Sequence, residues 1–210
     1  LHKEYRRQRQ MCIRDRHNSI LVRYSNDFSI WDLESVNHYK DQTDIFFTCH
    51  EFSYNKIAEA YEPYLGLIRQ MFHKYCSGTL EEFMEECDVY KLQRPVFESY
   101  FEKGFCERTE QILIDEVEYE QERMHSSIVT MLQKLSEICP IVIVLNRFQL
   151  ASKSTMQLTN RLLQTKNKNI GIVLGVNDVQ SIPEFAHEEW DAICESMDDR
   201  NMVYLSLIHI

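Results

Sequence analysis

The feature that most constrains the fold is the C-terminal part of the chain, where buried-strand patterns alternate with helical ones. The run IVIVL at 141–145 follows Pro140 and predicts a fully buried strand that ends at Asn146 and Arg147. After it we expect a helix over about 152–165, a strand over 170–176, a helix over about 183–196 and a strand from Met202. Strands that alternate with helices through short connections are typical of a parallel sheet covered by helices.

The N-terminal part adds two further strands and a long helical block. Strands are predicted over 19–24 and 43–49, with a helix over 30–40 between them. Helical spacing of apolar residues then continues over about 54–138, with Pro63 as a kink or a break and Thr79 as an N-cap. The expected class is therefore α/β: a three-layer parallel sheet flanked by helices, with a large helical block between strands two and three.

Composition excludes several classes of function. The net charge of −10 and the pI of about 5.3 predict no direct nucleic-acid binding by this segment. No apolar run reaches the roughly 20 residues that a membrane helix needs, so we expect no membrane association. The seven cysteines are scattered and odd in number, which is typical of reduced thiols in a cytoplasmic protein.

Near each end of the chain lies a six-residue segment that does not look like part of the native protein. MCIRDR at 11–16 and LSLIHI at 205–210 resemble translated sequencing-adapter text. We therefore treat 1–18 as an N-terminal segment that is partly artefact and 205–210 as an artefact tail. The expected native part is one α/β domain over 19–204, a fragment of a longer protein.

Polar residues stand where the predicted strands end. In open parallel sheets, ligands bind beyond the carboxyl ends of the strands, which makes Asn146, Arg147 and Asn177 the candidate cofactor-binding residues. Arg147 either clamps an anion or forms a structural salt bridge. Asn146 either contacts a ligand or satisfies loop backbone as a buried amide. No catalytic residue and no metal-binding residue is predicted, because no histidine, cysteine or carboxylate pattern has the required spacing.

Three segments together resemble a known family. IVIVLNRFQLASKSTMQLTNRLL at 141–163 is similar to the Walker-B strand and the following helix in AAA-like modules of STAND-type bacterial signal-transduction ATPases. NIGIVLGVND at 169–178 looks like the strand that carries the sensor residue, and 44–71 is similar to the second strand and its helix. The resemblance covers roughly 19–204 and implies a P-loop-NTPase-like sheet and ATP or ADP as the ligands to test.

The chain departs from that family at both phosphate-binding motifs. The segment SNDFSIWD at 25–32, where a Walker-A loop is expected, contains neither glycine nor lysine, and no G-x-x-x-x-G-K occurs in the chain. At the Walker-B position Asn146 carries no charge and Arg147 carries the wrong charge to hold Mg²⁺. The resemblance and these departures together imply a non-catalytic, regulatory or scaffolding module of a larger bacterial signalling or transcription-regulating protein, whose partners are the parent protein's other domains or a second copy.

Two alternatives remain open. One is an active ATP-binding ATPase of the STAND or AAA type whose P-loop is missing from this fragment. The other is a plain α/β interaction domain without nucleotide ancestry. A strand order that places the 141–146 strand away from the 19–24 strand would favour the plain interaction domain.

Overall fold

The computed structural model describes residues 19–24, 44–55, 60–104, 117–165, 167–177, 182–197 and 202–205. The chain divides into two compact units, unit 1 (Leu1–Tyr61 with Cys139–Ile210) and unit 2 (Glu62–Ile138). The predicted helix over 30–40, the segment SNDFSIWD, the hexamer MCIRDR and all of LSLIHI except Leu205 lie outside the described residues.

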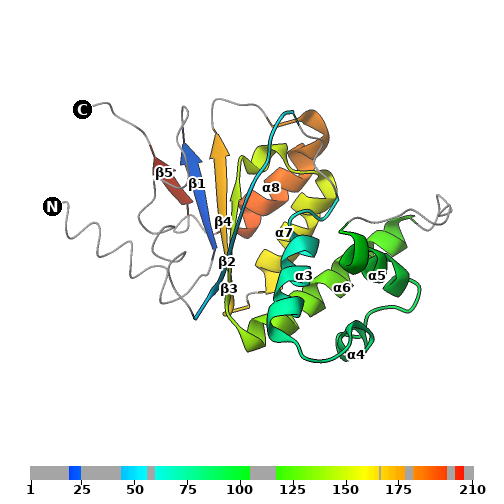
Figure 1. Cartoon of the computed structure of the whole chain (residues 1–210). Coiled ribbons are helices and arrows are strands. Elements are labelled where there is room, and N and C mark those ends of the chain that lie inside the picture. Colours follow the sequence, from blue (N-terminus) through cyan, green and yellow to red (C-terminus); the bar gives the residue numbers. More distant parts are fainter. Residues whose placement is uncertain are drawn as a thin grey trace. The chain divides into compact units, whose positions relative to one another are not determined.

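Unit 1 is built on a five-stranded sheet in which every neighbouring pair is parallel. Its strands are β1 (Ser19–Tyr24), β2 (Phe46–Glu51), β3 (Ile141–Asn146), β4 (Ile170–Asn177) and β5 (Met202–Leu205). The order across the sheet is β2-β3-β4-β1-β5, so β4 lies between β1 and β3 (Figure 1). The parallel arrangement predicted from the sequence is confirmed.

The strand β3 is buried on both of its faces. Ile143 and Leu145 are fully buried. Val144, which points to the opposite face, is also fully buried and packs against Phe47 and Val173. Burial on both faces explains why the run IVIVL is apolar throughout, without the alternation of a half-exposed strand.

In the described part of unit 1, two short 3₁₀ turns and two α-helices follow the strands β3 and β4. They are η3 (Phe148–Leu150), α7 (Lys153–Thr165), η4 (Glu184–Ala186) and α8 (His187–Ser196). The two α-helices lie side by side along the sheet (Figure 1). Ser152 caps α7, because its hydroxyl accepts a hydrogen bond from the Thr155 N–H at 3.3 Å. The helix expected from Pro183 instead opens with the turn η4.

Arg23 of β1 contacts two side chains of the helix α8. The guanidinium carbon of Arg23 lies 5.9 Å from the ring centroid of Trp190, in cation–π geometry. The same guanidinium approaches the Cys194 sulfur at 4.0 Å. Trp190 is thereby buried between its own helix and the sheet.

In the described residues of unit 2, all regular secondary structure is helical. Its helices are α3 (Tyr64–Tyr75), α4 (Leu80–Glu86), α5 (Arg94–Lys103) and α6 (Val117–Ile138). An aromatic cluster joins the first three, since the Phe72 ring lies 5.3 Å from that of Phe83 and 5.6 Å from that of Phe101. The buried Gln93 connects to α6, where it accepts a hydrogen bond from the Ser127 hydroxyl at 3.0 Å.

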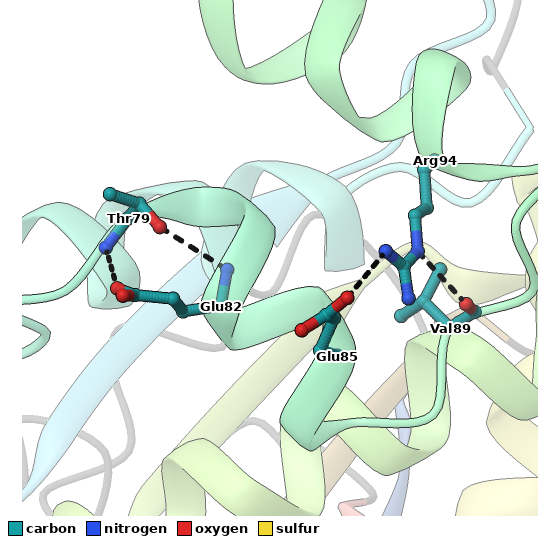
Figure 2. A network of polar contacts seen from close by, with 5 residues as sticks. All are labelled: Thr79, Glu82, Glu85, Val89 and Arg94. Atoms are coloured by element: carbon teal, nitrogen blue, oxygen red, sulfur yellow. Dashed lines mark hydrogen bonds and ion pairs between the residues drawn. The ribbon is translucent and has the colours of Figure 1, made fainter.

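Local sequence explains where these helices begin and end. The helix α3 begins at Tyr64, directly after Pro63, whose ring would break a continuous helix there, as the sequence predicted. Of the segment predicted as helix from Tyr54, residues 56–59 lie outside the described residues. Thr79 and Glu82 form the complete capping box of α4, drawn in Figure 2. Gly104 ends α5 in the left-handed conformation with φ 81°.

The architecture thus confirms an α/β class with a parallel sheet, flanking helices and a helical block between β2 and β3. Burial of both faces of β3 is consistent with a three-layer fold. Within the described ranges, no helix combines the length and the apolar character needed to cross a membrane.

Candidate functional site

The candidate site lies where the strands of unit 1 end. The register places Tyr24 of β1 beside Asn177 of β4, and Glu51 of β2 beside Asn146 of β3. Because the strands are parallel, these four carboxyl-terminal residues lie along the same edge of the sheet. The sequence prediction placed Asn146, Arg147 and Asn177 at this edge, and the structure brings all three to it.

Asn146 is a buried bridging residue. Asn146 is only 3% exposed, and its side-chain Oδ1 accepts a hydrogen bond of 2.8 Å from the Tyr24 hydroxyl. Its backbone oxygen accepts a second hydrogen bond, of 3.1 Å, from the Phe52 N–H. One residue therefore connects the ends of β1 and β3 with the chain that leaves β2.

Arg147 lies directly after β3 in an uncommon backbone conformation. Its φ of 53° and ψ of 43° belong to the left-handed region, which costs most residues other than glycine about 1–2 kcal/mol. Its neighbours Asn146 and Phe148 are both buried, so the backbone is fixed on either side of it. The carbonyl of Arg147 accepts the Leu150 N–H at 2.9 Å and so begins η3.

The guanidinium of Arg147 forms an ion pair with Glu51. The Nε to Oε1 distance is 3.3 Å, and the side chains are 39% and 46% exposed. A pair this exposed contributes about 0–1 kcal/mol to stability. Of the two predicted roles for Arg147, the structural salt bridge is therefore present, and it is a weak one.

Asn177 is held by a residue that the sequence analysis missed. The backbone N–H of Asn177 donates to the Gln149 Oε1 at 3.4 Å, and both residues are buried. Gln149 lies in η3, three residues beyond the end of β3. A glutamine in a polar connection gives no periodic signal, so its burial could not be read from the sequence.

Tyr24 was likewise not predicted as a site residue. Burial raises the pKa of its phenol above the usual 10.0, while the charge of Arg147 and hydrogen bonds from it act in the opposite direction. The phenol is therefore neutral at physiological pH and remains a hydrogen-bond donor to Asn146. Tyr24 ends an apolar strand, so in the sequence it is indistinguishable from a core aromatic residue.

Other polar groups that the structure describes near this edge are engaged in structural contacts. The His50 ring packs edge-on against Phe52 with centroids 4.5 Å apart. Lys153 lies 3.0 Å from the Glu189 Oε1, which joins α7 to α8. Tyr61 hydrogen-bonds to Ser154, yet burial raises the pKa of Tyr61 to about 12. Among the described residues, no group of three or more His, Cys, Asp or Glu side chains is arranged to hold a metal ion.

At the strand ends that the structure describes, this edge thus offers hydrogen-bond donors and the cation Arg147, which is paired with the carboxylate of Glu51. Such a set can bind an anion, but it lacks the acidic pair that positions Mg²⁺ and an attacking water in a phosphoryl-transfer site. No protein-family model and no curated protein matches the chain.

Proposed function

We propose that this chain is a non-catalytic, ATPase-like regulatory or scaffolding module of a larger bacterial signalling protein. Its signal would be conformational, transmitted through contacts with neighbouring domains or with a second copy. A conformational signal needs two states with different contacts and needs no chemical step.

The strand order bears on the choice between this proposal and a plain interaction domain. From the strand β5 to the strand β2, the order across the sheet is β5-β1-β4-β3-β2. Because β4 separates β3 from β1, the criterion stated in the sequence analysis favours the plain α/β interaction domain, which is therefore the second candidate function. A fold alone does not define an activity, so the residues at the edge must carry the functional argument.

The observation that carries the proposal is the pair of side chains at the end of β3. A magnesium-dependent ATPase needs an acidic pair at this position. Here Asn146 accepts a hydrogen bond from the Tyr24 hydroxyl, and Arg147 forms an ion pair with Glu51. These contacts replace metal ligands by hydrogen bonds and an ion pair internal to the protein. The strand keeps its shape and its place in the sheet, and the chemistry that needs a metal is lost.

The test is phosphate release from ATP by the purified chain in the presence of Mg²⁺, with an active AAA-type ATPase assayed in parallel. We expect no release above the protein-free blank, from protein that unfolds cooperatively on heating. Magnesium-dependent turnover that scales with protein concentration and elutes with the chain on gel filtration would contradict the proposal, and would favour an active ATPase instead.

A further inference from the structure

We propose that Arg147 and Asn146 form a binding site for a phosphate group that needs no divalent cation, and that Glu51 occupies this site internally when no ligand is bound. The inference rests on the proposed function, because it places a ligand at the same edge of the sheet. It goes further by naming the ligand chemistry and the internal competitor.

The first step concerns the donors of Asn146. Its Oδ1 accepts the hydrogen bond from Tyr24, which fixes the orientation of the amide and leaves Nδ2 as its donor. Within the described part of the chain, no residue accepts a hydrogen bond from this Nδ2. This Nδ2 is not one of the fully buried polar atoms that lack a partner in the described residues, so solvent or a ligand can reach it although Asn146 is only 3% exposed. Its natural partner is an acceptor that arrives at the edge of the sheet.

The second step concerns the guanidinium of Arg147. Its contact with Glu51 uses Nε, through a single oxygen, at 3.3 Å, and its side chain also hydrogen-bonds to the Tyr24 hydroxyl. The fork of N–H donors is therefore not saturated, and a phosphate group matches such a fork better than one carboxylate oxygen does. The left-handed backbone between two buried neighbours holds the base of this side chain in a fixed position.

The third step concerns charge. In a phosphate site that uses Mg²⁺, the metal neutralises the anion. Here the fixed cation next to the strand end is Arg147 itself, so recognition requires no metal. Glu51 opposes the ligand by pairing with the same cation. Because the pair is exposed and weak, an incoming phosphate group can displace Glu51 at low cost.

The experiment is a calorimetric titration of the 210-residue chain in excess EDTA, with inorganic phosphate, pyrophosphate and ADP as separate probes. Wild type is compared with Arg147→Gln and Glu51→Gln. The matched control is Lys168→Gln, which removes one exposed positive charge just before β4 begins. Lys168 therefore lies at the amino-terminal end of the strand, away from the proposed site. The melting temperature of each variant verifies that it is folded.

We expect binding of at least one probe by wild type in EDTA. Arg147→Gln should weaken it roughly tenfold or more, and Lys168→Gln by less than about twofold. Glu51→Gln should tighten binding about threefold, since it removes the competing carboxylate. Misfolding cannot produce this gain of affinity. Equal binding of pyrophosphate and ADP would assign recognition to the phosphate group alone, whereas binding of ADP only would assign it to a nucleotide.

Three results would overturn the inference: no binding of any probe in EDTA, binding that appears only with Mg²⁺, or equal loss in Arg147→Gln and Lys168→Gln. None of them bears on ATP hydrolysis, which the phosphate-release assay measures separately. The inference and the proposed function can therefore fail independently of each other.

Discussion

At the scale of single residues, the candidate site consists of side chains from strand ends that lie far apart in sequence. The hydrogen bond from Tyr24 to Asn146 spans 122 positions, and the one from Asn177 to Gln149 spans 28. The sequence could place Asn146, Arg147 and Asn177 at one edge, because parallel strands end on the same side of a sheet. It could not pair them with Tyr24 or Gln149, because pairing depends on which strands are neighbours.

The first prediction concerns the buried hydrogen bond of Tyr24. Tyr24→Phe removes the donor and leaves the buried Oδ1 of Asn146 without its partner. We expect the free energy of unfolding to fall by about 1–3 kcal/mol. Urea denaturation monitored by circular dichroism measures the loss.

The control is Tyr54→Phe, which deletes the hydroxyl of a tyrosine that is 62% exposed. Its effect should stay within about 0.5 kcal/mol. If both substitutions changed the free energy of unfolding equally, the hydrogen bond between Tyr24 and Asn146 would make no net contribution.

At the scale of elements, short sequence signals determine the helix ends where a side chain acts on its own backbone. Thr79 was predicted as an N-cap and is one, since its hydroxyl accepts from the Glu82 N–H at 3.2 Å and the Glu82 carboxylate accepts from the Thr79 N–H at 2.8 Å. The start of α8 was predicted too early, at Pro183. No capping side chain marks its first residue, so the turn η4 that precedes the helix leaves no local signal.

The second prediction concerns the capping box of α4 (Figure 2). Thr79→Ala should lower the free energy of unfolding by about 1 kcal/mol at neutral pH, because a helix of seven residues has few other contacts of its own. Ser77→Ala, at an exposed position just before the helix, is the matched control and should have little effect. Equal effects of the two substitutions in urea denaturation would argue against capping as the cause.

The pH dependence of the same box follows from Glu82. Its hydrogen bonds to Thr79 lower the pKa of the Glu82 carboxyl below its usual 4.5. The stability that Glu82 contributes is therefore present above the unfolded-state pKa and is lost as the pH falls through the lower folded-state pKa. Relative to Glu82→Gln, which keeps the hydrogen-bonding shape without titrating, wild type should lose stability over this acidic range only. A constant difference from pH 7 into that range would contradict the assignment.

The third prediction compares two glycines of unit 2. Gly104 has φ 81°, and a Cβ there would approach the Arg69 guanidinium at 3.2 Å, so Gly104→Ala should destabilise by about 1–2 kcal/mol. Gly66 lies within α3, and a Cβ there would meet only the Tyr100 hydroxyl at an ordinary 3.5 Å. Gly66→Ala should therefore stabilise by about 0.5 kcal/mol. Thermal unfolding of both variants tests the opposite signs, and a shared sign would contradict the role of backbone conformation.

At the scale of the whole molecule, the class of fold could be predicted and the arrangement of the strands could not. Apolar runs such as 141–145 and 170–176 reveal buried parallel strands, because such strands contact other groups on both faces. The position of β4 between β1 and β3 is a tertiary choice that no local pattern encodes. The sequence predicted a helical block over about 54–138 within one domain, and unit 2 covers 62–138. The boundary of the two units, at residues 61–62 and 138–139, has no linker-like composition that would have indicated it.

The contact between Arg23 and Trp190 has an optical consequence. The chain has two tryptophans, Trp31 and Trp190, and unit 2 contains neither. In a Trp31→Phe background all indole emission would come from α8, where Trp190 lies beneath a guanidinium 5.9 Å away. The emission wavelength would then report on unit 1 alone, while the ellipticity at 222 nm receives much of its signal from the helices of unit 2. Whether the two units unfold together becomes a question of whether two spectroscopic midpoints coincide.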